Sequence, residues 1–217
     1  DHVIFSPRVN VRFNPSEAVN LRVSYAGGYR APQAFDEDMH IAIVGGKRVR
    51  IRLADDLREE RSHSVSLSAD LYHTFGKVQT NLLVEGFYTI LDDVFALRDM
   101  DDAADGGKVK ERYNGSGATV RGFNVEGRAA FTRWFELQAG VTLQQSRYKE
   151  PEFWSEDAEV PPVRRMFRTP DAYGYFTASF KPVRNFTADL SGTCTGSMLV
   201  QHMAGSGVAQ DVAVSTP

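Results

Sequence analysis

The sequence predicts an all-β fold: an antiparallel, up-and-down transmembrane β-barrel segment of about eight long strands. Three observations predict it. Apolar and polar side chains alternate with a period of two along most of the chain. The alternating runs exceed the usual strand length of about five or six residues, and crossing a bilayer at a tilt needs about nine to eleven. Very short turns join the runs in pairs, whereas long polar loops separate the pairs.

The runs form four hairpins. The expected strands are residues 3–13, 19–29, 61–74, 78–98, 113–131, 135–148, 170–181 and 186–200. The expected turns are Asn14–Glu17, Phe75–Lys77, Arg133–Trp134 and Lys181–Asn185. Short turns at one end and long loops at the other are typical of outer-membrane barrels, in which the short turns face the periplasm.

Each long strand has one apolar row and one polar row. The expected bilayer-facing rows include Val65, Leu67, Ala69 and Leu71; Leu82, Val84, Tyr88 and Ile90; Phe123, Val125, Ala129 and Phe131; Leu137, Ala139, Val141 and Leu143; and Phe186, Ala188 and Leu190. The charged residues expected to face a hydrated lumen are Arg8, Arg12, Arg22, Asp70, Glu85, Glu126, Arg128 and Asp189. Leu83 and Phe87 are exceptions, because they are apolar residues in a polar row.

Aromatic residues gather near both ends of the strands. Phe13, Phe75, Trp134, Phe135 and Phe186 flank the short turns, and Tyr25, Tyr29, Tyr88 and Tyr148 lie toward the long loops. Two aromatic belts at the two bilayer interfaces are typical of membrane barrels. The general preference of aromatic residues for strands is the alternative explanation.

The three long loops are residues 30–60, 99–112 and 149–169. We expect a small extra hairpin in the first, formed by residues 41–44 and 47–51 around Gly45-Gly46. The second loop is acidic and contains glycine, and the third holds Trp154 and the basic pair Arg164-Arg165. No strand pattern is recognised in residues 203–217.

Two acidic segments carry oxygen ligands of the kind that calcium prefers, residues 36–40 and residues 99–105. Neither spacing fits an EF-hand, so solvated loops are the favoured interpretation and no metal site is predicted. The five histidines form no helical pair, and no nucleophile-elbow or metalloprotease motif occurs. We therefore predict no catalytic residues, no cofactor and no enzymatic activity.

Composition excludes several classes. A formal net charge of −3 gives no basic surplus for nucleic acid. No run of about 18 apolar residues predicts a membrane-spanning helix, and residues 1–7 do not resemble a signal peptide. The single cysteine, Cys194, forms no internal disulfide framework and is expected to be inert. The hydrophobic fraction of 42 % suits a soluble protein and a barrel equally, because only alternate strand residues face lipid.

Strand direction indicates a segment of a larger barrel. With the short turns at the periplasm, the first strand runs down into its turn and the last strand runs up from its turn. Both ends of the segment are then on the long-loop side, whereas complete bacterial barrels are expected to have both termini at the periplasm.

Four segments resemble sequence motifs of TonB-dependent outer-membrane receptors. Residues 29–38 resemble the "(F/Y)RAP" segment that follows an upward strand, and residues 57–62 resemble the "L-x-x-E-x-S" start of the next downward strand. Residues 114–126 resemble a "G-x-E-x-E" strand, with Asn124 where Glu is common, and residues 169–176 resemble a "TP" strand start. The order and spacing agree over about residues 5–200.

The resemblance implies the C-terminal portion of a 22-stranded barrel that imports a scarce, bulky nutrient such as cobalamin, a siderophore, haem or a glycan. We expect a partial barrel over residues 1–200 and a truncated external loop over residues 201–217. The family's plug domain and TonB box have no counterpart here, and neither has its final aromatic strand. The implied location is the outer membrane of a Gram-negative cell.

The long loops are expected to form part of the ligand mouth. The residues predicted to contact substrate are Tyr29, Phe35, Asp36, His40, Trp154 and Arg165. Expected partners are the lipid bilayer, the TonB complex through the plug domain, and a small-molecule or glycan nutrient, with a surface lipoprotein as a further candidate. Two alternatives remain open: a passive porin-like or adhesin barrel, and a soluble β-sandwich that acts as a binding module.

Overall fold

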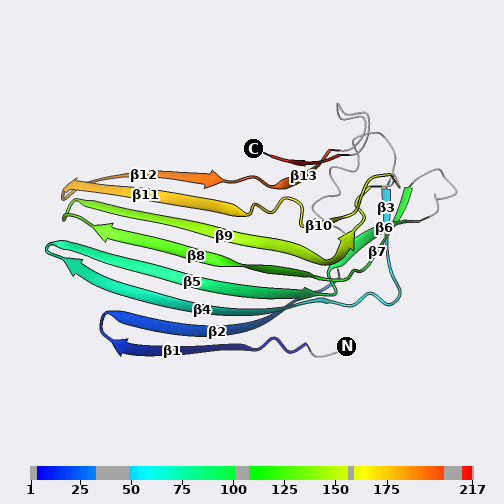
Figure 1. The fold of residues 1–217 in the computed structure, drawn as a ribbon, viewed down its shortest axis with the longest axis horizontal. Helices are drawn as coiled ribbons and strands as arrows, with labels where there is room; N and C mark the ends of the chain where they lie inside the picture. The colour runs from blue at the N-terminus through cyan, green and yellow to red at the C-terminus, as the bar shows by residue number, and fades with distance from the viewer. Residues whose placement is uncertain (1–3, 33–48, 101–107, 156–158, 203–211, 217) are drawn as a thin grey trace.

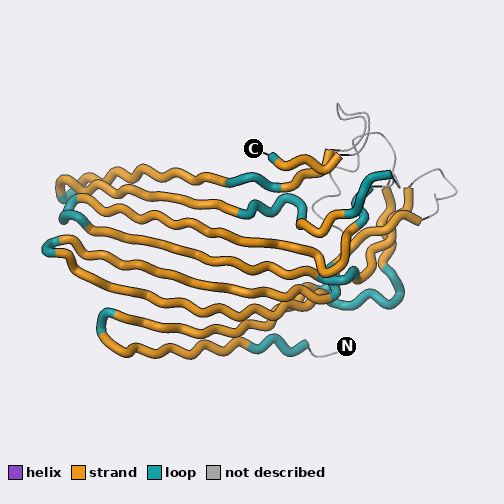
Figure 2. The backbone as a smooth tube through the Cα atoms, viewed as in Figure 1, coloured by secondary structure: helices purple, strands orange, loops and turns teal. Residues whose placement is uncertain are grey.

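The computed structural model describes residues 4–32, 49–100, 108–155, 159–202 and 212–216. Throughout these ranges the regular structure is β-strand (Figures 1 and 2). The long strands are β1 (Arg8–Ser16), β2 (Val19–Arg30), β4 (Glu60–Phe75), β5 (Val78–Asp92), β8 (Ala118–Ala130), β9 (Phe135–Glu152), β11 (Ala172–Val183) and β12 (Phe186–Thr195). No helix in the described residues has the length and apolar character needed to cross a membrane.

The long strands lie side by side in chain order, β1-β2-β4-β5-β8-β9-β11-β12, and each is antiparallel to its neighbours. The short strand β10 (Val163–Arg165) pairs with β9 outside this path. Figure 1 shows the short turns together at the left end of the sheet and the long connections at the right. The predicted all-β, antiparallel, up-and-down arrangement is confirmed. Within the described residues the path stays open between β1 and β12, so this segment does not close a barrel.

The four short turns are where the sequence places them. Gly76 has a φ of +63°, a left-handed conformation that glycine adopts without steric cost, and it reverses the chain between β4 and β5. Between β1 and β2 the register shifts after Phe13, so β1 extends through Ser16 into the predicted turn. The remaining hairpins turn between Ala130 and Phe135 and between Val183 and Phe186.

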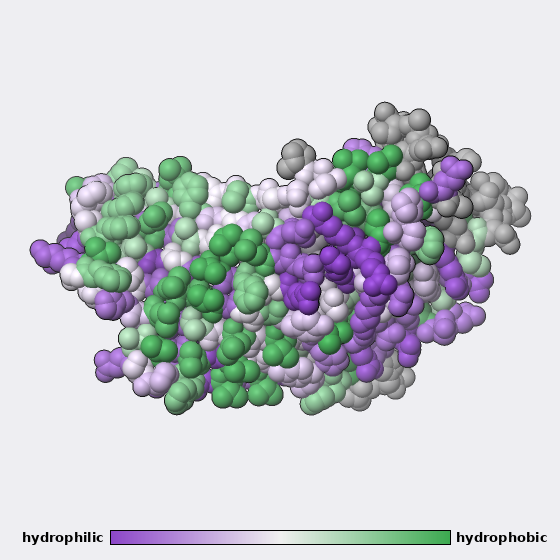
Figure 3. All heavy atoms as spheres, in the orientation of Figure 1, coloured by the Kyte–Doolittle hydropathy of each residue, from purple (hydrophilic) through white to green (hydrophobic). Residues whose placement is uncertain are grey.

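One face of the sheet is apolar and uncovered. Cross-strand register puts the predicted bilayer-facing residues opposite one another, as in Val65↔Tyr88, Val84↔Val125 and Phe123↔Leu143. Many of these side chains are 37–63 % exposed. Figure 3 shows this apolar surface as a zone bordered by hydrophilic surface toward both ends of the strands.

The sheet has no packed core of its own. In the described ranges the buried apolar residues are Ala54, Ala118 and Ala178, all small. A β-sandwich would instead bury its apolar rows against a second sheet. The sandwich alternative is therefore wrong, and we call the uncovered apolar face the outward face.

The opposite, inward face carries a hydrogen-bonded polar network. Thr142 donates to Asn124 at 2.8 Å, and Asn124 donates to Glu85 at 3.2 Å. Across Gly140, the ring of Tyr175 reaches Glu126, whose carboxylate accepts from the Tyr175 hydroxyl. The predicted exception Phe87 belongs to this face because its ring lies across Gly122, where a Cβ would come 2.8 Å from Phe87 Cζ.

A second, three-stranded sheet at the loop end corrects two predicted strands. It contains β3 (Val49–Leu53), β6 (Phe95–Met100) and β7 (Lys108–Asn114), in the order β3-β7-β6. The predicted strands 78–98 and 113–131 are each broken at the same level, after Asp93 and before Ala118. Asp93 has a φ of +55° and Gly117 has a φ of +89°, and at these two residues the polypeptide leaves the long sheet. We call β3, β7 and β6 the mouth sheet.

The loops are more structured than expected. Residues 99–112 include the ends of β6 and β7, which pair from Phe95↔Asn114 to Met100↔Val109. The predicted hairpin partner of residues 47–51, residues 41–44, lies outside the described residues, so that hairpin stays a prediction. β3 pairs in parallel with β7. β9 continues to Glu152, where it meets β10.

Two further strands occupy the C-terminal part of the chain. β13 (Leu199–His202) and β14 (Val212–Ser215) form an antiparallel pair, so the absence of a strand pattern from residue 203 onward was a wrong prediction. Its physical cause is length: four residues are too few for a period of two to stand out from noise.

Candidate functional site

The Glu60 carboxylate links the mouth sheet to the loop ends of β2 and β4. Glu60, at the start of β4, forms an ion pair with Arg30 at the end of β2, with Nε to Oε2 at 2.7 Å. The same carboxylate accepts a hydrogen bond at 2.5 Å from the backbone N–H of Phe95, the first residue of β6. The Arg30 guanidinium lies over the Phe95 ring, 5.0 Å from its centroid. These contacts join three segments that are far apart in the sequence.

The Asn114 side chain links two neighbouring segments, at Arg58 and Asp93. Its Oδ1 accepts from the Arg58 backbone N–H at 2.8 Å, and its Nδ2 donates to the carbonyls of Arg58 and Asp93 at 2.9 and 2.8 Å. The Arg58 side chain pairs with the Asp93 carboxylate at 3.2 Å. One amide therefore holds the ends of β5 and β7 against the segment that enters β4.

Charged side chains are enclosed within this assembly. Glu111 is 7 % exposed and forms an ion pair with Arg98, and Arg112 is 2 % exposed with its guanidinium 5.9 Å from the Phe95 ring centroid. The hydrogen bond and the charge of Glu111 raise the pKa of Arg98. The Arg98 side chain is 57 % exposed, so Glu111 is the enclosed member of the pair, and loss of Arg98 would leave the Glu111 charge uncompensated.

Of the predicted substrate-contact residues, Tyr29 lies on β2, whereas Trp154 follows β9 and Arg165 ends β10, which pairs with β9. Tyr29 is 52 % exposed and lies in the outward row of β2, directly opposite Arg61. Trp154 packs edge-on against Phe167 with ring centroids 5.5 Å apart. Arg165 pairs with Asp171 at 3.0 Å and donates to the Ser197 carbonyl. Phe35, Asp36 and His40 lie outside the described residues, so their roles remain predictions.

One aromatic assignment is wrong. Tyr148 was expected in the outward belt near the long loops, but it pairs with Ala118 in the inward row. Alternate strand residues face opposite sides, and Tyr148 is one residue out of phase with Leu137, Val141 and Leu143. At the other end Phe13, Phe75 and Phe186 are more than half exposed beside their turns, and their place in a bilayer belt stays a prediction.

The sequence analysis did not predict the residues that hold the mouth sheet in place. Two of them, however, lie in segments that it had singled out as family-like motifs. Arg30 is the arginine of the "(F/Y)RAP"-like segment, and Glu60 is the glutamate of the "L-x-x-E-x-S"-like segment. The two motif residues pair with each other and receive Phe95. Among the described residues no three His, Cys, Asp or Glu side chains gather as a metal site would require.

Glu152 provides a pH test of the β9–β10 junction, which lies beyond the outward apolar rows. Partial burial raises the pKa of its carboxyl. In β7, burial raises the pKa of Tyr113, and the nearby charge of Glu152 adds to that rise. A raised pKa in the folded state means that folding favours the protonated carboxyl over the ionised one. The unfolded-state pKa of a glutamate is about 4.3, so the junction loses stability as the pH rises from that value through the folded-state pKa.

Glu152→Gln is therefore expected to remove this pH dependence and to make the junction more stable than wild type at neutral pH. Hydrogen exchange of β10 amides at pH 4 and pH 7 measures it. The control is Glu150→Gln, an exposed carboxyl two residues away, which should leave the wild-type pH dependence in place. Equal pH dependence in the Glu152→Gln variant and the wild type would contradict the assignment.

Comparisons with known proteins agree with this architecture. Residues 1–207 match the family described as TonB dependent receptor-like, beta-barrel. No curated protein matches the sequence. Among solved structures, the siderophore receptor PirA from Pseudomonas aeruginosa aligns with a TM-score of 0.62 at 15 % identity, covering 88 % of this chain and 33 % of that one.

Two further structures give the same picture. The FrpB iron transporter from Neisseria meningitidis aligns with a TM-score of 0.59 at 16 % identity, covering 89 % of this chain and 27 % of its own. The ferric-catecholate import receptor Fiu from Escherichia coli K12 aligns with a TM-score of 0.60 at 12 % identity, covering 96 % and 27 %. This chain thus spans a third or less of these structures, and the likeness concerns the fold.

The family match covers nearly the whole chain, the strands form an open antiparallel wall with a bare apolar face, and the two resembling motifs meet in one ion pair. The chain belongs to the β-barrel family of TonB-dependent outer-membrane transport receptors.

Proposed function

We propose that this chain is part of the barrel wall of an active-transport receptor in the outer membrane of a Gram-negative cell. The barrel takes up a scarce, bulky nutrient and draws its energy from the TonB complex through a plug domain. Residues 1–200 supply eight of its strands, and residues 201–217 belong to an external loop. The observation that carries the proposal is the pairing of an uncovered apolar face with hydrogen-bonded polar side chains on the other side.

The two faces define the partners. The outward rows contact the bilayer, because leaving so much apolar surface in water is unfavourable at about 25 cal/mol per Å². The inward network offers hydrogen bonds to a plug domain and to water. The mouth sheet, together with the loop around Trp154 and Arg165, borders the entrance where the nutrient binds, alongside Phe35, Asp36 and His40. A surface lipoprotein would meet the same loops.

Ferric siderophores are the first substrate class to test, since PirA and FrpB are a siderophore receptor and an iron transporter. Cobalamin, haem and glycans are the other classes. The test is uptake of each labelled nutrient by cells that express the full receptor, with and without TonB. Loss of uptake without TonB supports active transport, whereas uptake that persists without TonB supports a passive barrel. No uptake of any of them favours an adhesin.

Glu60→Gln is expected to weaken uptake at limiting nutrient by about tenfold, the ratio that corresponds to about 1.4 kcal/mol. Neutralising Glu60 removes the ion pair with Arg30 that holds the mouth sheet in place, and charge-assisted hydrogen bonds contribute about 1.5–3 kcal/mol. Uptake at saturating nutrient should change little. Glu17→Gln, in an exposed short turn, is the matched control. An unchanged half-saturating concentration would show that the Glu60 contacts do not shape the entrance.

A further inference from the structure

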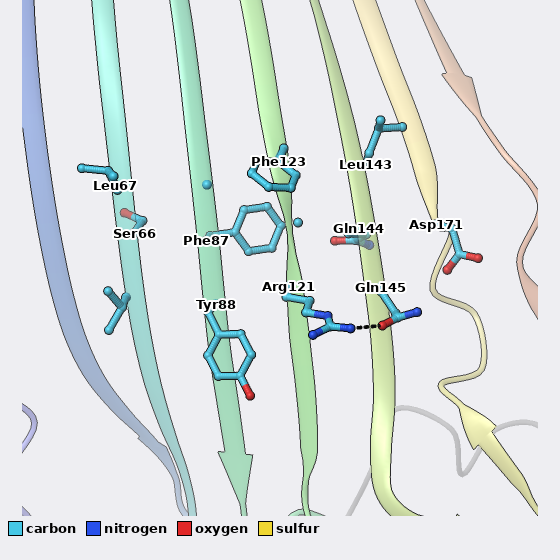
Figure 4. A pocket seen from close by; sticks show the side chains of 13 residues that line it. Ser66, Leu67, Phe87, Tyr88, Arg121, Phe123, Leu143, Gln144, Gln145 and Asp171 are labelled. Carbon is cyan, nitrogen blue, oxygen red and sulfur yellow. Dashed lines mark hydrogen bonds between the residues drawn. The ribbon is translucent and has the colours of Figure 1, made fainter.

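The outward face becomes polar where the long strands approach the mouth sheet. Tyr88, Arg121 and Gln145 are direct cross-strand neighbours on β5, β8 and β9. Arg121 donates to Gln145 Oε1 at 2.9 Å, and both side chains are drawn in Figure 4. Arg147 is two residues beyond Gln145 in the same row, so it is a diagonal neighbour of Arg121 at about 7–8 Å between Cα atoms.

An apolar groove adjoins these side chains. Its volume is about 710 Å³, and its outward lining includes Leu67, Gly86, Phe123 and Leu143, with Tyr88 and Arg121 at its polar end. Gly86 forms a low point in the wall because it lacks a side chain, and the Phe123 ring borders it: a Cβ on Gly86 would lie 3.4 Å from Phe123 Cε1. Figure 4 shows Leu67, Phe123 and Leu143 above Tyr88, Arg121 and Gln145, which places these three apolar side chains nearer the short turns.

Positive charge at the polar end of the groove is not neutralised within the described residues. Arg121 and Arg147 are exposed, and no ion pair joins either to a carboxylate there. Asp171 lies at the groove, but its carboxylate pairs with Arg165 at 3.0 Å. Asp92, on the same outward face, pairs with Lys149. Two guanidinium groups therefore remain available to an external anion.

We propose that this site binds a phosphate-bearing anionic lipid of the outer leaflet. The phosphate bridges Arg121 and Arg147, and one acyl chain lies in the groove over Gly86. Guanidinium groups match phosphate oxygens with paired, charge-assisted hydrogen bonds, and the groove continues from the headgroup toward the bilayer centre. The inference rests on the proposed membrane placement. It concerns the face that points away from the nutrient path, which is why a water-soluble nutrient is not its ligand.

The test is native mass spectrometry of the full receptor in non-ionic detergent, titrated with phosphatidylglycerol, phosphatidylcholine and glycerol 3-phosphate. We expect phosphatidylglycerol to bind at least tenfold more tightly than either comparison molecule. Arg121→Gln and Arg147→Gln should each weaken it by about tenfold, the loss of one charge-assisted contact. Arg133→Gln, which removes an exposed arginine at the opposite end of the wall, should leave binding unchanged.

A separate substitution tests whether an acyl chain occupies the groove. Gly86→Leu fills the groove and should weaken phosphatidylglycerol while leaving the weaker binding of glycerol 3-phosphate as it was. Circular dichroism melting of each variant verifies that it is folded. Equal binding of glycerol 3-phosphate and phosphatidylglycerol would overturn the lipid in favour of a free anion, and wild-type affinity in the Arg121→Gln, Arg147→Gln double variant would overturn the site. Because no nutrient is present, either result is independent of the uptake experiments.

Discussion

Leu67→Arg is expected to lower the stability of the receptor in a bilayer by about 1–2 kcal/mol, between the about 2–4 kcal/mol measured for arginine on the lipid side of a membrane barrel at midplane and the about 0–1 kcal/mol measured near the interfaces. Leu67 is 60 % exposed on the outward face, between Val23 and Gly86 on the neighbouring strands and one outward position below the level of Arg121. An arginine there places a guanidinium in hydrocarbon, and the adjacent residues offer no counter-charge.

Ser66→Arg provides the matched control because it introduces the same side chain one residue earlier, on the inward face. Ser66 is opposite Ser24 and Phe87, and the new guanidinium would enter the space that the proposed barrel keeps hydrated. A surface substitution of this kind changes stability by about 0.5 kcal/mol or less. Guanidinium unfolding of both variants of the full receptor in phospholipid vesicles measures the difference. If Ser66→Arg proved the more damaging of the two, the assignment of the faces would be reversed.

Gly122→Ala is expected to destabilise the wall by about 3 kcal/mol or more, at the upper end of what overpacking costs. A Cβ on Gly122 would lie 2.3 Å from the Leu143 carbonyl oxygen and 2.8 Å from Phe87 Cζ. The carbonyl belongs to the β9 backbone, so relief requires β8 and β9 to separate, whereas the Phe87 ring could rotate away. The substitution therefore acts on the β8–β9 pairing itself.

Gly127→Ala is the control on the same strand. A Cβ on Gly127 meets no atom within 4 Å, and removing a glycine limits the freedom of the unfolded chain by about 0.4–1 kcal/mol in favour of folding. Thermal unfolding of the two variants should therefore shift in opposite directions. A Gly122→Ala variant as stable as Gly127→Ala would mean that β8 and β9 are farther apart than the structure shows.

The strand positions and the two faces could be predicted because they depend on the alternation of apolar and polar residues within each strand. The strand expected at residues 19–29 is found at Val19–Arg30, and the one expected at 135–148 begins at Phe135. The assignment of rows is also local, because alternate residues of a strand must face opposite sides. Glu85 and Glu126 on the polar side and Val84 and Val125 on the apolar side follow from this alone. The chemistry of the site is different, since it depends on which loops meet.

The amino-acid sequence by itself determined the all-β class, the hairpins with their short turns, and the separation of an apolar from a polar face. Only the tertiary structure decided that β3 pairs with β7, that Asp93 and Gly117 end the long strands at one level, and that Arg30 and Glu60 hold Phe95. The physical reason is range. Period and turn chemistry act between residues a few positions apart, whereas the mouth sheet joins segments separated by dozens of residues, and no local pattern records which of them will meet.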